Sequence, residues 1–276
     1  MISTDFQLEW SQNTSFLIDT DETLDYLSTF DSSSFHRFVI VLDKNLKDSF
    51  FSLINNALSK HEKEIIVIEV VPNEINKGID QTIELIKTLE DKGVGRFDLL
   101  ISVGGGFVSD ITSFVASIFM RGIPFIAIPT TLIGQVDAVT AGKTCINGPN
   151  TKNLLGTFYF PRFAYINTLF LSTLPKRELR QGWSEIFKYA LLDSHLLIDL
   201  MQKYFDEPSN LVMTRIIEET IRIRMKIRKV DPLASNLGHT FGHAFEKISN
   251  YRISHGDAIS IGTLMAIQFG EKKGVT

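Results

Sequence analysis

Short apolar segments alternate with amphipathic segments in the first part of this chain, and this alternation constrains its fold more than any other feature. Apolar runs rich in β-branched residues occupy residues 38–42, 65–71, 99–103 and 125–128. Between or after them, residues 47–60, 78–92 and 110–120 have the apolar spacing of helices. Strands separated by helices favour a parallel sheet with helices on both faces. The sequence therefore predicts an α/β domain.

A different pattern follows from about residue 170. Residues 176–206, 209–230, 236–249 and 257–270 repeat apolar positions with a period near 3.6, which predicts helices. We expect two domains, an α/β domain over residues 1–170 and an all-α domain over residues 171–276. The chain stops soon after the fourth helix, so the helical domain is expected to be truncated and to expose apolar surface.

Polar and glycine residues follow the ends of the predicted strands. Ligands of parallel α/β sheets bind beyond the carboxyl ends of the strands, and the positions there are Asp43, Glu74, Gly104–Gly106, Thr130 and Thr131. The three glycines precede a helix, where backbone N–H groups can approach a phosphate closely. The G-x-G-x-x-G pattern is incomplete because Ser109 takes the place of its last glycine. A Rossmann-like cofactor site, with Asp43 on a ribose hydroxyl, and a plain tight turn both remain open.

One carboxylate and three histidines form the second constellation. Neutral imidazoles and a carboxylate are the usual ligands of a catalytic divalent metal, and the chain offers Glu185, His239, His243 and His255. On a helix, His239 and His243 share one face because they are four residues apart. Histidines that only pack or face solvent are the alternative.

The charge is unevenly distributed. Residues 1–100 hold 18 Asp and Glu against 9 Lys and Arg, whereas residues 121–188 hold 8 Lys and Arg against 3 Asp and Glu. The basic stretch includes Lys143, Lys152 and Lys188, and these suit either a small anionic ligand such as a phosphate ester or an ordinary solvated surface. The formal net charge of −4 argues against general nucleic-acid affinity.

Cellular location is constrained by cysteine content and by the lack of membrane signals. Cys145 is the only cysteine, which excludes an intrachain disulfide and suits a reducing compartment. We interpret it as a small buried residue. Residues 1–5 show no basic region followed by an apolar run, and no apolar stretch reaches the length of a membrane span. We therefore expect a soluble cytoplasmic protein.

Many short blocks, taken together and in order, resemble the 3-dehydroquinate synthases of the sugar-phosphate cyclase superfamily. The resemblance runs from about Val39 to the end of the chain. Its blocks are GGGFVSD (104–110), MRG (120–122), PTTL (129–132), VD (136–137), GKT (142–144), KNL (152–154), TLP (173–175), EIFKY (185–189), NLGHTFGHAFE (236–246) and HGDA (255–258).

The resemblance implies a role for each matching residue. It implies that zinc or cobalt is held by Glu185, His239 and His255. His243 is then the histidine beside the substrate, and Asp137 meets substrate hydroxyls. Arg121 is implied to reach the neighbouring subunit's site in a homodimer. The implied substrate set is Lys143, Lys152, Asn153, Lys188 and Asn236, and the implied NAD set is Asp43, Glu74, Lys77, Gly105, Gly106, Asp110, Thr130 and Thr131, with Lys143 and Lys152 near both.

The resemblance also implies the chemistry. The family's substrate is 3-deoxy-D-arabino-heptulosonate 7-phosphate. Bound NAD oxidises one ring hydroxyl, phosphate leaves by β-elimination, NADH returns the hydride, and an aldol step closes the carbocycle of 3-dehydroquinate in the shikimate pathway of aromatic amino acid biosynthesis. The protein is accordingly expected to be a lyase that uses NAD and a metal and to need no nucleic acid or membrane partner.

Three departures from the family pattern keep other functions open. Ser109 replaces a usual glycine, residues 230–235 form a short loop in which Arg228 is the nearest arginine, and the last helices of the family are absent. The alternatives are a sister cyclase of specialised metabolism, such as a 2-deoxy-scyllo-inosose or 2-epi-5-epi-valiolone synthase, a more distant metal-dependent polyol dehydrogenase, and a catalytically silent homologue that only binds a partner.

Overall fold

The computed structural model describes residues 14–231, 233–250 and 252–275; the N-terminal segment 1–13 and Pro232 of the short loop lie outside these residues. Within them, six parallel strands form one sheet in the order β1-β8-β5-β4-β2-β3. The strands are β1 (Ser15–Asp19), β2 (Arg37–Asp43), β3 (Glu64–Val70), β4 (Leu99–Gly104), β5 (Phe125–Pro129) and β8 (Phe163–Asn167). This confirms the predicted parallel α/β sheet and adds β1 and β8, which the sequence did not predict.

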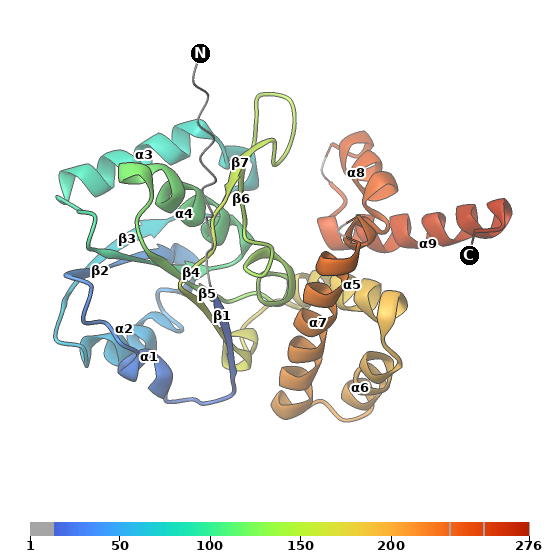
Figure 1. Cartoon of the computed structure of the whole chain (residues 1–276), viewed down its shortest axis with the longest axis horizontal. Helices are drawn as coiled ribbons and strands as arrows, with labels where there is room; N and C mark the ends of the chain where they lie inside the picture. Colours follow the sequence, from blue (N-terminus) through green and yellow to red (C-terminus); the bar gives the residue numbers. More distant parts are fainter. Residues whose placement is uncertain (1–13, 232, 251, 276) are drawn as a thin grey trace, which may run out of the picture.

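Alternate residues of each central strand pack on opposite faces of the sheet, as the two-residue period of a strand requires. Val39 and Val41 of β2 join the apolar cluster on the face covered by α3 (Ile79–Asp91) and α4 (Gly106–Ile118). Phe38 and Ile40 join the cluster on the other face, beneath α1 (Asp25–Thr29) and α2 (Phe51–Ser59). Figure 1 shows these helices on the two sides of the sheet.

A two-stranded hairpin, β6 (Lys143–Ile146) and β7 (Leu155–Phe158), packs on α4. Its loop carries residues 147–154. The hairpin lies next to the sheet in Figure 1 and was not predicted.

The described chain after β8 is mainly helical, as predicted. They are α5 (Lys176–Asp193), α6 (His195–Asp206), α7 (Asn210–Val230), α8 (His239–Ile248) and α9 (His255–Lys273). The single helix predicted over 176–206 is wrong, because Ser194 has an extended backbone (φ −152°) and its hydroxyl accepts a hydrogen bond from the Leu197 N–H at 3.0 Å. A serine that caps a helix start in this way ends one helix and begins the next.

The beginnings of α8 and α9 position two histidines of the predicted metal set. Gly238 has a positive φ of 80°, so α8 begins at His239. Ser254 caps α9, which therefore begins at His255. Large apolar side chains of α9 are exposed, including Leu264 at 58% and Phe269 at 55%, which fits the expected exposure of apolar surface. Among the described residues, no helix combines the length and the apolar character that crossing a bilayer requires.

Candidate functional site

Three helices bring Glu185, His239 and His255 together. One ligand atom of each lies within 4.8 Å of the other two, and His239 Nε2 is 3.9 Å from Glu185 Oε1. Glu185 is fully buried, and its Oε1 atom accepts no hydrogen bond among the described residues. A buried carboxylate oxygen without a partner is costly. A cation between this oxygen and the imidazoles would satisfy it, so the donor set fits a divalent metal.

The two imidazoles are oriented by hydrogen bonds on their other nitrogen. His239 Nδ1 lies 3.3 Å from the Leu237 carbonyl oxygen, and His255 Nδ1 lies 3.3 Å from Glu246 Oε1. Both partners only accept hydrogen bonds, so the proton resides on Nδ1 and Nε2 keeps its lone pair. Burial, together with the charge of Lys188, lowers the pKa of His239 to about 4, which keeps this ring neutral at pH 7.

Lys188 forms a buried ion pair with Glu185. Its ammonium donates to Glu185 Oε2, and both side chains are almost completely buried. Burial alone would raise the pKa of Glu185, but the charge of Lys188 and the hydrogen bond that it donates outweigh burial and lower that pKa. The carboxylate therefore stays ionised. Lys188 therefore lies beside the predicted metal ligands and neutralises one of them, Glu185.

The carboxyl ends of the central strands meet as predicted. The Thr130 N–H donates to the Gly104 carbonyl at 2.9 Å, and a Cβ atom on Gly104 would lie 3.1 Å from Asp43 Cβ. A Cβ atom on Gly105 would lie 2.9 Å from Thr131 Cγ2. Asp43 itself accepts a hydrogen bond from the Asn45 N–H at 2.9 Å, and burial raises its pKa.

Lys77 joins this edge to the hairpin loop. Its buried ammonium lies 2.5 Å from Asp110 Oδ2 at the start of α4 and 2.9 Å from Asn153 Oδ1. Glu74 Oε1 is 3.8 Å away. The Asp110 charge raises the pKa of Lys77 despite the opposing effect of burial. Lys77 therefore holds two other residues of the predicted site in place.

A cavity of about 750 Å³ extends between the sheet edge and the helices. Its lining includes Glu74 from the sheet edge, residues 147–152 of the hairpin loop, and Glu246 and His255 from α8 and α9. Lys152 Nζ lies 3.4 Å from Glu246 Oε1 and 3.7 Å from Glu74 Oε1. A volume of this size suits a small organic ligand.

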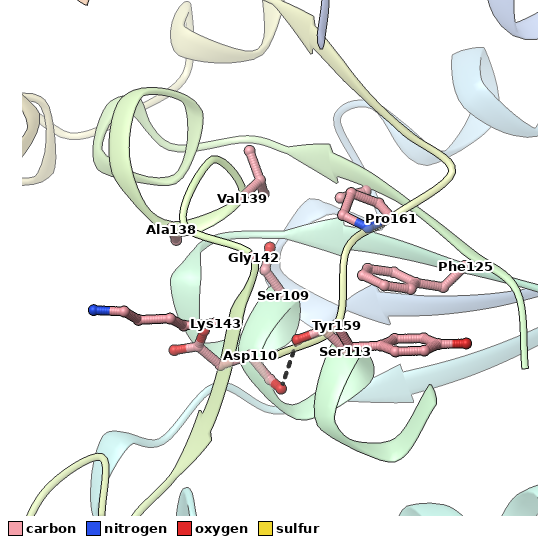
Figure 2. A pocket seen from close by; sticks show the side chains of 11 residues that line it. Ser109, Asp110, Ser113, Phe125, Ala138, Val139, Gly142, Lys143, Tyr159 and Pro161 are labelled. Atoms are coloured by element: carbon pink, nitrogen blue, oxygen red, sulfur yellow. Dashed lines mark hydrogen bonds between the residues drawn. The ribbon is translucent and has the colours of Figure 1, made fainter. Parts of the chain in front are cut away.

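Other predicted residues lie apart from this cavity. Figure 2 shows Lys143 extending away from the rings of Phe125 and Tyr159, beside Asp110. The small cavity in that view measures about 10 Å³, which is room for about one water. Asn236 lines a different hollow, with Leu233 and Phe241.

Asp137 and Arg121 are not among the residues that line the cavity of about 750 Å³. Asp137 forms an ion pair with Arg224 of α7. Arg121 is exposed just beyond the carboxyl end of α4, whereas Asp110 lies in that helix's first turns. The eight helical steps from Asp110 to Ile118 rise roughly 12 Å, so Arg121 lies well away from the contact between Asp110 and Lys77.

Two residues of the site were not predicted. Glu246 contacts His255 and Lys152, and it lies three residues after His243 and seven after His239, a spacing that places all three on one helix face. That spacing was a usable signal. Arg224 gave none, because its partner Asp137 is 87 residues away in sequence.

Cys145 lies in the hairpin and is half-buried rather than fully buried as interpreted, and its Sγ lies 3.7 Å from Lys77 Nζ. Burial, reinforced by the charge of Asp110, raises the pKa of the thiol to about 12.

Because the thiolate is the reactive form, alkylation of Cys145 by iodoacetamide at pH 8 should be about a thousandfold slower in the native chain than in the unfolded chain. Mass spectrometry of timed samples measures both alkylation rates. Equal rates in the native and the unfolded chain would contradict the raised pKa of the Cys145 thiol.

Comparison with known proteins places this chain in a family. The family model described as the 3-dehydroquinate synthase N-terminal domain matches residues 67–181, and the corresponding C-terminal model matches residues 182–276. The 3-dehydroquinate synthase of Pyrococcus abyssi is 43% identical over 218 residues, covering 76% of this chain and 64% of the relative. That of Pyrococcus furiosus is 37% identical over 247 residues, covering 87% and 72%. This chain therefore spans just under two thirds of the Pyrococcus abyssi protein.

Solved structures of sugar-phosphate cyclases resemble this chain as well. A 2-deoxy-scyllo-inosose synthase, complexed with carbaglucose-6-phosphate, NAD+ and Co2+, has a TM-score of 0.81 at 25% identity, covering 94% of this chain and 74% of that chain. A 2-epi-5-epi-valiolone synthase from Streptomyces hygroscopicus with NAD+ and Zn2+ bound also has a TM-score of 0.81 at 25% identity, covering 99% and 78%. An iron-containing alcohol dehydrogenase from Thermococcus thioreducens, at 16% identity and a TM-score of 0.69, shares the fold. With both family models and a relative of which 72% is matched, the chain belongs to the 3-dehydroquinate synthase family.

Proposed function

We propose that this protein is a 3-dehydroquinate synthase, a cyclase that releases phosphate from 3-deoxy-D-arabino-heptulosonate 7-phosphate. The observation that carries the proposal is the unpartnered buried Oε1 atom of Glu185, which faces His239 close to a cavity that is also lined from the sheet edge. Family membership and the NAD+ and metal ions bound in the two cyclase structures support it. We further propose that residues 1–170 bind NAD and that residues 171–276 bind metal and substrate.

The metal would be held by Glu185, His239 and His255. Zinc or cobalt in this position would supply a Lewis acid that polarises substrate oxygens. Glu185 contributes the charge, while the two imidazoles contribute lone pairs on Nε2. His243 lies beside them with a side chain that is 63% exposed, and partial burial lowers the pKa of its ring. Its Nε2 can therefore accept a substrate proton at neutral pH.

NAD would lie along the carboxyl edge of the sheet. It supplies and recovers the hydride when bound. Gly105 and Gly106 lead into α4, whose N-terminus favours the pyrophosphate. Asp43, Glu74, Asp110, Thr130 and Thr131 border the same edge, and Lys77 fixes Asp110.

The substrate's phosphate and carboxylate would be held by cations around the cavity. Lys152 lies at its lining, and Asn153 is held beside it through Lys77. We assign Lys143, Lys188 and Asn236 to the same set by family membership, with Asp137 on substrate hydroxyls. We also propose a cytoplasmic homodimer in which Arg121, exposed beyond the carboxyl end of α4, serves the partner's site, without nucleic acid or membrane.

A phosphate-release assay with NAD and zinc tests the proposal. Release should occur with 3-deoxy-D-arabino-heptulosonate 7-phosphate and should be lost in Glu185→Gln, with Glu218→Gln as the matched surface control. The short loop over residues 230–235 and the likeness to the two other cyclases keep one alternative. Release only with glucose 6-phosphate or sedoheptulose 7-phosphate would favour that sister cyclase. Stoichiometric zinc without release from any sugar phosphate would overturn both.

A further inference from the structure

Glu246 is a nearly fully buried carboxylate that has no role in the proposed function so far. It lies in α8, and its side chain is 4% exposed. Its Oε1 atom is 3.3 Å from His255 Nδ1 and 3.4 Å from Lys152 Nζ, and its Oε2 atom is 3.9 Å from His243 Nε2. A single carboxylate thus contacts a proposed metal ligand and a proposed anion-binding lysine.

The contact between Glu246 and His255 affects metal binding. A histidine that binds a metal through one nitrogen commonly donates its other N–H to a carboxylate, which fixes the ring and makes the metal-binding nitrogen more basic. Glu246 Oε1 is placed to accept that hydrogen bond from His255 Nδ1. The strength of this effect depends on how much negative charge the carboxylate retains.

The contact between Glu246 and Lys152 responds to anion binding. Lys152 belongs to the hairpin loop that lines the cavity, and it also lies 3.7 Å from Glu74 Oε1 at the sheet edge. While the ammonium is close to Glu246, it neutralises part of the carboxylate's charge. An anion that draws Lys152 away therefore leaves Glu246 with more charge to polarise His255.

We propose that Glu246 is a positioning residue that couples divalent-metal binding at Glu185, His239 and His255 to anion binding at Lys152. The inference rests on the proposed function for its two sites. Each ligand tightens the binding of the other, because coupling between two sites is reciprocal. Glu246 thereby links the metal helices to the hairpin loop across the cavity.

Zinc affinity tests this coupling without any turnover. It is measured by competition with a chromophoric chelator, with sulfate as the anion probe and with chloride at equal ionic strength as its control. In the unchanged chain, sulfate should tighten zinc binding severalfold over chloride. Glu246→Gln should weaken zinc binding about 10- to 100-fold and abolish the sulfate effect. The matched control Glu218→Gln, on an exposed helix face, should retain both properties.

Lys152→Met tests the same contact between Lys152 and Glu246 at its lysine end. The Lys152 side chain is 26% exposed, and the substitution leaves the buried Glu246 carboxylate in place. It should abolish the sulfate effect while keeping zinc binding at least as tight as in the unchanged chain. The double variant should show no additional loss of the sulfate effect, because both changes break one link. Unchanged zinc affinity in Glu246→Gln, or a sulfate effect that survives in either single variant, would overturn the proposal.

Failure of the proposed function is distinguishable from failure of this inference. A chain that releases no phosphate from any sugar phosphate, yet shows zinc–sulfate coupling through Glu246, refutes the cyclase assignment alone. A chain that is an active cyclase but whose Glu246→Gln variant binds zinc normally refutes the coupling alone.

Discussion

Glu185→Ala should destabilise the metal-free chain by about 3–5 kcal/mol, because it leaves the Lys188 ammonium buried without its partner. Glu185 is fully buried and the Lys188 side chain is 2% exposed, so water cannot replace the lost carboxylate. The Tyr189 ring, whose centroid is 4.7 Å from Lys188 Nζ, compensates only weakly. Chemical denaturation in the presence of a chelator measures the loss. The same variant should bind no zinc.

A double variant separates the two effects of this substitution. Replacing both partners, as in Glu185→Leu with Lys188→Met, removes the buried charges together and should recover most of the lost stability. Zinc binding should stay absent, because the carboxylate ligand is still missing. A Glu185→Ala chain that unfolds at the denaturant concentration of the unchanged chain would show that the pair does not carry the expected energy. Tight zinc binding by either variant would remove Glu185 from the ligand set.

The predictability of the strands follows from their burial. Strands β2 and β4 are buried on both faces, so their residues form nearly continuous apolar runs that are visible in the sequence. Strand β8 is buried too, but it is short and contains Tyr165 and Asn167, whose polar groups hydrogen-bond each other at 3.1 Å inside the fold. A strand that carries its own buried polar pair does not show the apolar signature. Strand β1 lies at the sheet edge and is only partly buried.

The residues of the candidate site also fall into two groups, those that could be predicted from the sequence and those that could not. Glu185, His239 and His255 could be predicted, because residue type and helical spacing limit what such a group can do, and the structure does bring them together. The pairing of Asp137 with Arg224 could not be predicted, since it depends on how α7 docks against a π-helical turn at Gly134–Ala138. Contacts between distant segments follow from packing, which no local pattern encodes.

Packing also sets the approach of the proposed metal ligands to one another, through Gly256, which follows His255 in the first turn of α9. A Cβ atom there would lie 2.5 Å from Gln181 Cα and 2.9 Å from the Gln181 carbonyl oxygen, both in the backbone of α5. Glu185 lies one helical turn after Gln181 on that helix. Gly256→Ala therefore forces α9 away from α5 and separates His255 from Glu185.

We expect Gly256→Ala to cost about 1–3 kcal/mol of stability from overpacking and to weaken zinc binding about 10- to 100-fold, as loss of ligand orientation does elsewhere. Gly95→Ala is the matched control, because its Cβ would meet nothing closer than Asp98 Oδ2 at 3.8 Å. Chelator competition and thermal unfolding of both variants provide the measurements. If Gly256→Ala binds zinc as tightly as Gly95→Ala does, the close approach of α9 to α5 does not set the metal geometry, and the ligands must converge by another route.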